Sequence, residues 1–451
     1  MNEVTFTGHA GSARATIPNT RSVDEAALFR KVTLRLIPFL LFAYVLCYID
    51  RSNVSFAYLR FKTDVGLTDA SYGLGAGIFY LGYVLFEVPS NMLLEKLGAR
   101  AALLRIMVAW GIVSASTAFV TTPFQFYAVR ILLGAAEAGF FPGLILYLSY
   151  WFPATRRAGA TSMLMVSLCV AGMLGGPLSG GIMQLFGDAH TLKSWQWMFL
   201  LEGAPALLMG VIAFFYLDNK PEDARWLTTD EKHHLRALLD SEQTGKQHIE
   251  GAGAIFAALL RDPRIYLLSL AYFFSPWALS VLNFWGPAII RQSGIGSPLA
   301  NGLLTMIPNI AGAISMITVG RRSDRVQERR WHFMTMVSVT AIGSLLLAAF
   351  HTSWLPAIVF LTFVSIGQYG AFSVFWSIPP TYLSKSTAAI GIAVISSLGQ
   401  ISGLLSSWML GVLKDMTGSM VTGLYVVAAI QIATGIIVIL AFRSQLPASS
   451  Q

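Results

Sequence analysis

Residues 34–57 read LRLIPFLLFAYVLCYIDRSNVSFA, an apolar run that is long enough to cross a bilayer and that carries Asp50 and Arg51 side by side. A helix of about 20 apolar residues spans the hydrocarbon core. Each charged side chain at the centre of such a helix costs roughly 2.5–3.5 kcal/mol by insertion scales. A pair retained at that cost predicts a site that handles an ion or a charged substrate.

The whole chain is as apolar as this segment suggests. Of its 451 residues 55% are hydrophobic and 12% are charged, and the mean hydropathy is +0.62, far from the composition of soluble domains. Gly and Pro inside apolar runs do not exclude helix in a membrane. We therefore predict an all-α integral membrane protein with twelve transmembrane helices, near residues 33–58, 71–94, 101–121, 123–150, 158–184, 195–217, 264–290, 298–320, 332–350, 354–383, 386–412 and 421–442.

One long polar interruption separates six of these spans from the other six. We expect two six-helix bundles, 33–217 and 263–442, joined by a cytoplasmic linker, 218–262, that contains a short amphipathic helix starting near Thr228. Residues 1–32 are expected to form a disordered cytoplasmic tail, and residues 443–451 a second tail.

Basic residues of the short loops predict the orientation. If the helices alternate in direction, most of these residues lie on one side, which is then cytoplasmic: Lys96, Arg100, Arg105, Arg156, Arg157, Arg321, Arg322, Arg325, Arg329 and Arg330. Both termini are expected on that side of a cell membrane, such as a bacterial inner membrane. The net charge of +8 therefore indicates contact with a lipid bilayer rather than with nucleic acid.

Residue patterns for metals, cofactors and enzymes do not stand out in the sequence. Cys47 and Cys169 both fall within predicted helices, and the histidines are isolated or lie in the linker, so no metal-ligand spacing exists. No phosphate-binding glycine loop, zinc-protease motif or serine elbow is visible. We expect neither an enzyme nor a bound cofactor or metal.

Two loops at equivalent positions of the halves repeat an acid beside a base: 91–100 (NMLLEKLGAR) and 320–325 (GRRSDR). They resemble the Gly-x-x-x-Asp-Arg-x-Gly-Arg signature of the major facilitator superfamily, with Asn91 in place of the glycine. The resemblance implies two pseudo-symmetric bundles of that fold. We expect a gating latch at these loops that stabilises the outward-facing state, formed by Glu95, Lys96, Arg100, Asp324 and Arg325; the alternative is that the charges only hold the loops inside.

Three segments carry a closer resemblance: 48–53 (YIDRSN), 130–143 (RILLGAAEAGFFPG) and 375–380 (FWSIPP). Together they resemble the anion:cation symporter family, which includes permeases for tartrate, phthalate, hydroxyphenylacetate and sugar acids. The resemblance implies proton-coupled symport of a small organic carboxylate. It also implies that Arg51 is the substrate partner and Arg130 the partner of the acids.

The spacing of these residues supports a shared site. Arg130 and Glu137 are seven residues apart, about two helical turns or ~10 Å, and both can face one opening with Asp50 and Arg51. Protonation of Asp50 and Glu137 would then free a guanidinium, whose planar fork suits a carboxylate. The alternative is a buried ion-pair network that only fixes helix packing. Glu87 and Glu202 lie near helix ends, where pairing or solvation is expected at least as much as function.

Polar and aromatic residues near the midplane are the candidates for substrate binding: Tyr80, Tyr83, Asn283, Trp285, Ser373, Trp376, Ser397 and Gln400. Related permeases often carry asparagines at the last two positions, so Ser397 and Gln400 disfavour a sugar acid and leave an aromatic carboxylate open. We expect a monomeric importer that couples a small organic acid anion to protons. A proton antiporter or exporter of the same fold and an anion exchanger are the alternatives, although two inward-facing arginines argue against a cationic cargo.

Overall fold

The computed structural model describes residues 24–187, 191–243, 263–379 and 388–441. In these ranges the chain forms helices joined by short turns, and no strand occurs among them. Eleven helical segments of the described residues are long and apolar enough to cross a bilayer. The prediction of an all-α membrane protein is confirmed.

Helix α1 (Glu25–Val65) is longer at both ends than the predicted span. Its first turn is capped by Asp24, whose carboxylate accepts hydrogen bonds from the N–H groups of Ala26 and Ala27 at 3.0 and 3.2 Å. Gly66 ends the helix in the left-handed conformation, with φ +75°. The predicted disordered tail therefore includes one stretch, 25–32, that is helical; residues 1–23 lie outside the described part.

The remaining helices of the N-terminal half follow the predicted spans except at one break: α2 (Asp69–Leu97), α3 (Ala99–Ser116), η1 (Thr117–Phe119), α4 (Pro123–Glu137), α5 (Phe140–Ser149), α6 (Ala154–Leu185) and α7 (Ser194–Tyr216). The predicted single helix 123–150 is interrupted directly after Glu137. Gly139 there has φ +81°, a conformation that favours glycine, and a Cβ on it would lie 2.6 Å from the Ser90 hydroxyl oxygen.

The C-terminal half has a second irregular span, in which 264–290 is divided into four pieces: α10 (Pro263–Phe274), α11 (Trp277–Ser280), the π-helical turn η3 (Val281–Trp285) and α12 (Gly286–Gln292). It continues with α13 (Pro298–Val326), α14 (Arg330–Phe350), α15 (Trp354–Phe375), α17 (Ala388–Thr417) and α18 (Val421–Ala441). The predicted span 354–383 ends earlier, at Phe375, and residues 380–387 lie outside the described part. Helix α17 occupies the place of the predicted span 386–412.

The linker contains the predicted amphipathic helix, α8 (Thr229–Gln243), after a short turn η2 (Pro221–Asp223). It lies beside the start of α1, and Lys31 forms an ion pair with Glu231 at 2.8 Å. Residues 244–262 are outside the described part. We call the end of the molecule where α1 begins and α8 lies the terminal face, and the other end the opposite face.

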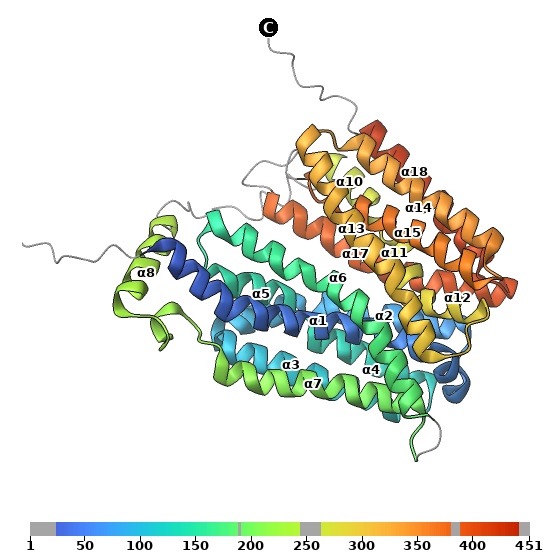
Figure 1. Cartoon of the computed structure of the whole chain (residues 1–451), viewed down its shortest axis with the longest axis horizontal. Helices are drawn as coiled ribbons and strands as arrows, with labels where there is room; N and C mark the ends of the chain where they lie inside the picture. Colours follow the sequence, from blue (N-terminus) through green and yellow to red (C-terminus); the bar gives the residue numbers. More distant parts are fainter. Residues whose placement is uncertain (1–23, 188–190, 244–262, 380–387, 442–451) are drawn as a thin grey trace, which may run out of the picture.

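The two halves lie one above the other in Figure 1, with α1–α7 below and α10–α18 above. They meet along two helix pairs, α2 with α17 and α6 with α13. Glycines allow the backbones to approach closely there: a Cβ on Gly176 would lie 2.5 Å from the carbonyl oxygen of Gly302, and one on Gly73 would lie 2.4 Å from that of Ser407. These pairs enclose a cavity between the halves.

Candidate functional site

A buried ion pair forms the centre of the site. Arg51 of α1 donates from Nε to Oε2 of Glu137, the last residue of α4, at 2.6 Å. The thiol of Cys47, one turn before Arg51, donates to the same oxygen at 3.2 Å. Glu137 is fully buried, whereas the Arg51 side chain keeps 16% of its surface exposed. The pair therefore has one member in the protein interior and one at its edge.

Asp50 lies behind this pair in a polar setting of its own. Its Oδ1 accepts hydrogen bonds from Asn53 at 3.1 Å and from the Ser114 hydroxyl of α3. Its Oδ2, like Oε1 of Glu137, is buried and has no hydrogen-bond partner in the described protein. A buried carboxylate oxygen without a donor is costly. Each of the two acids therefore keeps one buried oxygen that no described group satisfies.

Arg130 takes different partners from those the sequence suggested. It is buried, and it donates from Nε and Nη2 to the carbonyl oxygens of Gly75 and Ala76 on α2, at 3.2 and 3.1 Å. Its guanidinium also lies 5.2 Å from the ring of Phe79. Helix α4 approaches α2 closely through Gly134, where a Cβ would lie 2.0 Å from the Phe79 carbonyl oxygen. The backbone of α2 thus becomes the nearest set of acceptors.

A cavity of about 200 Å³ lies between the halves and touches this centre through Arg51. Asp50, Arg130 and Glu137 are not among its lining residues, so only one of the four predicted ionisable groups faces it. Its walls come from both halves: Tyr48, Arg51, Ser52, Tyr80, Leu168, Ala171 and Gly172 on one side, and Tyr272, Pro276, Leu279, Ser280, Asn283, Phe284, Tyr369, Phe372, Gly399, Gln400 and Gly403 on the other.

Three of the eight polar and aromatic residues predicted to bind the substrate belong to the cavity wall. Tyr80, Asn283 and Gln400 line the cavity. Tyr83 lies behind it, with its ring 5.1 Å from the Arg51 guanidinium. Trp376 lies after α15, with its ring 4.8 Å from that of Tyr272.

The remaining three predicted residues, like Tyr83 and Trp376, are not part of the cavity wall. Trp285 is buried toward the opposite face, where its ring contacts those of Tyr58 and Tyr72. Ser373 donates to the Gly370 carbonyl of its own helix at 2.9 Å. Ser397 belongs to α17 but is not among the lining residues.

Several site residues were not predicted from the sequence. Tyr48 precedes Arg51 by one helical turn, and its position on the same face of α1 was the available signal. Tyr272 and Tyr369 occur in apolar runs without a distinguishing pattern. The space for Tyr272 is made by Gly399, where a Cβ would lie 2.1 Å from the ring. Such a pairing of an aromatic ring with a glycine 127 positions away is visible only in three dimensions.

Glu202 is buried in the middle part of α7 and is neither solvated nor near a helix end, in contrast to what the sequence had suggested. Its Oε1 accepts a hydrogen bond from the Ser179 hydroxyl at 2.6 Å. Glu87 of α2 is half-buried.

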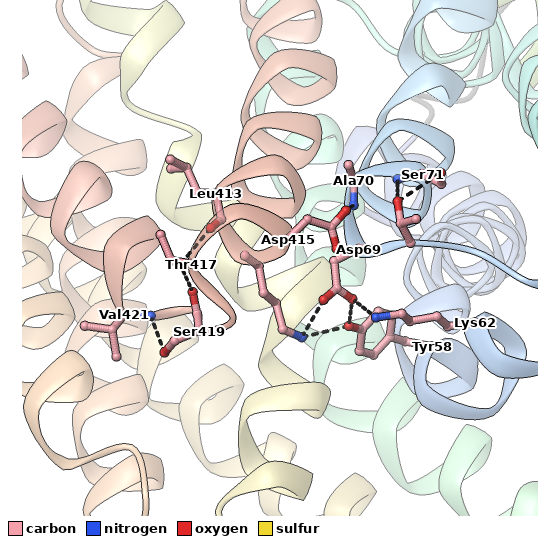
Figure 2. Close-up of polar contacts among 12 residues, drawn as sticks. Tyr58, Lys62, Asp69, Ala70, Ser71, Leu413, Asp415, Thr417, Ser419 and Val421 are labelled. Carbon is pink, nitrogen blue, oxygen red and sulfur yellow. Dashed lines mark hydrogen bonds and ion pairs between the residues drawn. The ribbon is translucent and has the colours of Figure 1, made fainter.

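Polar contacts join the two halves at the opposite face (Figure 2). The N–H groups of Asp69 and Ala70, at the start of α2, donate to the carboxylate of Asp415 on α17 at 2.9 and 2.7 Å. Lys414 donates to the Tyr58 hydroxyl at 2.7 Å and lies 3.7 Å from Asp69. A negative group at a helix N-terminus is favourable because of the helix dipole. This end of the molecule is therefore held shut by charges.

The predicted latch residues lie at the terminal face, and the contacts of Arg100 and Asp324 stay within their own halves. Arg100 donates from Nε to the Phe214 carbonyl at 2.8 Å. Asp324 lies 3.9 Å from Arg329. Lys96 and Arg325 occupy the last turns of α2 and α13, and the side chain of Glu95 lies outside the described part. The latch between these loops stays a prediction.

Beside Asp324, Glu328 anchors the start of α14. Partial burial raises the pKa of Glu328. Hydrogen bonds from the backbone N–H of Trp331 at 2.7 Å and from His332 lower the pKa by more than burial raises it, so the pKa lies below the usual range. The carboxylate stays charged where the helix dipole favours an anion.

Residues 40–407 match the family model of the Major Facilitator Superfamily. The chain belongs to this superfamily. A protein of Agrobacterium vitis named "Putative tartrate transporter" is 43% identical over 423 residues, which cover 93% of this chain and 92% of that protein. A "Quinolone resistance transporter" of Acinetobacter baumannii is 38% identical, with 90% and 93% of the two chains covered.

Solved structures of the superfamily share the fold. The partially occluded inward-open xylose transporter XylE of E. coli superposes with a TM-score of 0.71 at 15% identity, covering 93% of this chain and 100% of that one. The Major Facilitator Superfamily comprises membrane transporters, so the chain is a transporter and not an enzyme. The prediction of this fold from the two loop repeats is confirmed.

Proposed function

We propose that this transporter takes up a small organic carboxylate together with protons, by alternating access between its two halves. The observation that carries the proposal is the position of Arg51, which pairs with buried Glu137 and also lines the cavity. Its Nη2 is buried and has no hydrogen-bond partner in the described protein, while 16% of the side chain stays exposed. One guanidinium is therefore available to two carboxylates, one from the protein and one from the substrate.

Coupling follows from competition for that guanidinium. When Glu137 binds a proton, it loses its charge and its strong hold on Arg51, and the substrate carboxylate takes its place as the charged partner. When the proton leaves, Glu137 pairs with Arg51 again and the substrate is released. Asp50 is the second proton-binding group, since it lies behind the pair with one oxygen unpartnered.

In this proposal the two halves rock against each other, and this movement opens the cavity to one side of the membrane at a time. The charged contacts at the opposite face correspond to a state that is open toward the terminal face, which we assign to the cytoplasm from the basic loops. The proposed location is a bacterial inner membrane, with both termini inside and the transporter acting as a monomer. The domain limits proposed are residues 33–217 and 263–442 for the two bundles.

Export is the second candidate, because one relative is named for quinolone resistance. The two directions are separated by the gradient that drives net flux. Accumulation under an inward proton gradient supports symport, whereas accumulation under an outward proton gradient supports antiport.

The test uses the purified full chain in proteoliposomes. Under an inward proton gradient we expect accumulation of a labelled carboxylate, and we expect Glu137→Gln to abolish it because the side chain can no longer bind and release a proton. Substrate exchange between equal pools, which needs no net proton movement, should persist in that variant. Glu222→Gln, a change on the terminal face, is the control.

Loss of both accumulation and exchange in Glu137→Gln would indicate a structural ion pair. Undiminished accumulation after collapse of the proton gradient would contradict proton coupling and favour sodium coupling or anion exchange.

A further inference from the structure

We infer that the cavity selects an organic acid with a single carboxylate and a flat aromatic body, rather than a hydroxylated dicarboxylate or a sugar acid. This inference rests on the proposed function, since it concerns the substrate of the same site. It depends on three properties of the cavity wall: its charge, its aromatic side chains and the state of its hydroxyl groups.

The wall carries one positive charge. Arg51 is the one cationic side chain among the cavity-lining residues that the structure describes. Arg130 is turned to the carbonyls of α2, and Lys414 is held by Tyr58 and Asp69 at the opposite face. A second carboxylate on the substrate would thus lose its hydration without gaining a cationic partner, which is unfavourable. The wall matches a monoanion.

Aromatic rings from both halves line the cavity beside Arg51. Tyr48 and Tyr80 approach from the N-terminal half, and Tyr272 and Tyr369 from the C-terminal half. The ring of Tyr272 is fixed from behind by Phe375, which stacks on it at 4.9 Å. Rings held in this way offer faces and edges to another flat ring, and such contacts add to simple burial of apolar surface.

The two serine hydroxyls of the wall are already engaged. Ser280 shares a hydrogen bond with Ser406 at 2.5 Å, and Ser52 donates to the Ile49 carbonyl of its own helix at 3.1 Å. Asn283 and Gln400 remain as the amide groups of the cavity. These two amides and the hydroxyls at the edges of the tyrosine rings can serve a few polar atoms of a substrate, whereas every hydroxyl of a sugar acid needs a partner when it leaves water.

The first experiment compares acids of matched size in proteoliposomes that contain the full chain. Labelled benzoate and nicotinate are tested for proton-driven uptake beside tartrate and gluconate, and each acid is tested as a competitor. We expect uptake of the aromatic acids and no competition by tartrate or gluconate in excess. Uptake of tartrate or gluconate without the aromatic acids would overturn this inference and leave carboxylate transport standing. Uptake of none of the four would contradict the proposed function itself.

The second experiment tests the ring contact directly. Replacing the aromatic ring by Tyr272→Leu should raise the KM for benzoate about 2- to 10-fold, the range of an aromatic pair, and should change the KM for cyclohexanecarboxylate much less. Tyr272→Phe keeps the ring and should retain the wild-type ratio of the two KM values. The control is Tyr425→Leu on α18, where the side chain is 50% exposed. Equal changes for the aromatic and the saturated acid in Tyr272→Leu would contradict recognition of an aromatic body.

Discussion

At the scale of single residues, the proposed function depends on Arg51, whose guanidinium binds Glu137 and also faces the cavity. Its Nε is bound to Glu137 and its guanidinium carbon lies 5.1–5.2 Å from the centres of three rings, those of Tyr48, Phe79 and Tyr83. Arginine keeps its charge in such surroundings and offers several donors in one plane. Lysine would supply the charge at one point only.

We therefore predict that Arg51→Lys weakens transport although it conserves charge. The loss of a charge-assisted hydrogen bond, roughly 1.5–3 kcal/mol, corresponds to an increase in KM of about 10- to 150-fold. Initial rates of uptake as a function of substrate concentration measure the change. Arg321→Lys, an exposed residue near the end of α13, is the matched control. An unchanged KM would mean that Arg51 contributes charge but not directed hydrogen bonds.

At the scale of helices, the closed opposite face depends on close contact between α6 and α13. A Cβ on Gly302 would lie 2.0 Å from the carbonyl oxygen of Gly176, so even one methyl group must separate the two backbones. Gly296 lies just before α13, and a Cβ on it would have no other atom within 4 Å among the residues that the structure describes. The two glycines allow the same substitution to be compared in a tight and in an open place.

We predict that Gly302→Ala opens this contact, whereas Gly296→Ala does not. Overpacking costs about 1–3 kcal/mol, which shifts the ratio of closed to open opposite faces by roughly 5- to 150-fold. The measurement is the rate at which an impermeant maleimide labels Thr305→Cys, buried beside Gly176, in a background of Cys47→Ala and Cys169→Ala. Equal labelling rates in the two alanine variants would show that the glycine contact does not hold the face shut.

At the scale of the whole molecule, Asp415 joins the halves by binding the start of α2 (Figure 2). We predict that Asp415→Asn, which keeps the shape but removes the charge, weakens closure of the opposite face. The expected loss is about 1–2 kcal/mol, from the helix dipole and the charge-assisted bonds. Spin labels on Thr63 and Tyr425 should report a larger population of long distances across this face.

The control for that experiment is Asp64→Asn. Asp64 contacts Lys193 at 2.6 Å and Trp195 at 2.7 Å, all within the N-terminal half. Its replacement should leave the distance distribution unchanged. If Asp64→Asn and Asp415→Asn shift the distances equally, the effect is one of local stability and not of contact between the halves.

The sequence by itself determined the solvent, the class of fold and the family. Transfer from water to hydrocarbon depends on each side chain separately, so apolar runs and the rare charges within them, such as Asp50 and Arg51, can be recognised one segment at a time. Because hydropathy is read one segment at a time, it does not show where the backbone leaves the regular helix. The predicted helices were therefore least accurate at the break after Glu137 and at the π-helical turn that ends at Trp285.

The tertiary structure alone decided which side chains meet. Arg130 and Glu137 share one helix as predicted, yet Glu137 pairs with Arg51 and Arg130 binds carbonyls of α2, because helix rotation and the close approach at Gly134 set the available partners. The same packing brings Tyr272 into the cavity and turns Trp285 toward the opposite face. Partner choice depends on contacts between residues far apart in the chain, and no local pattern of hydropathy or charge contains that information.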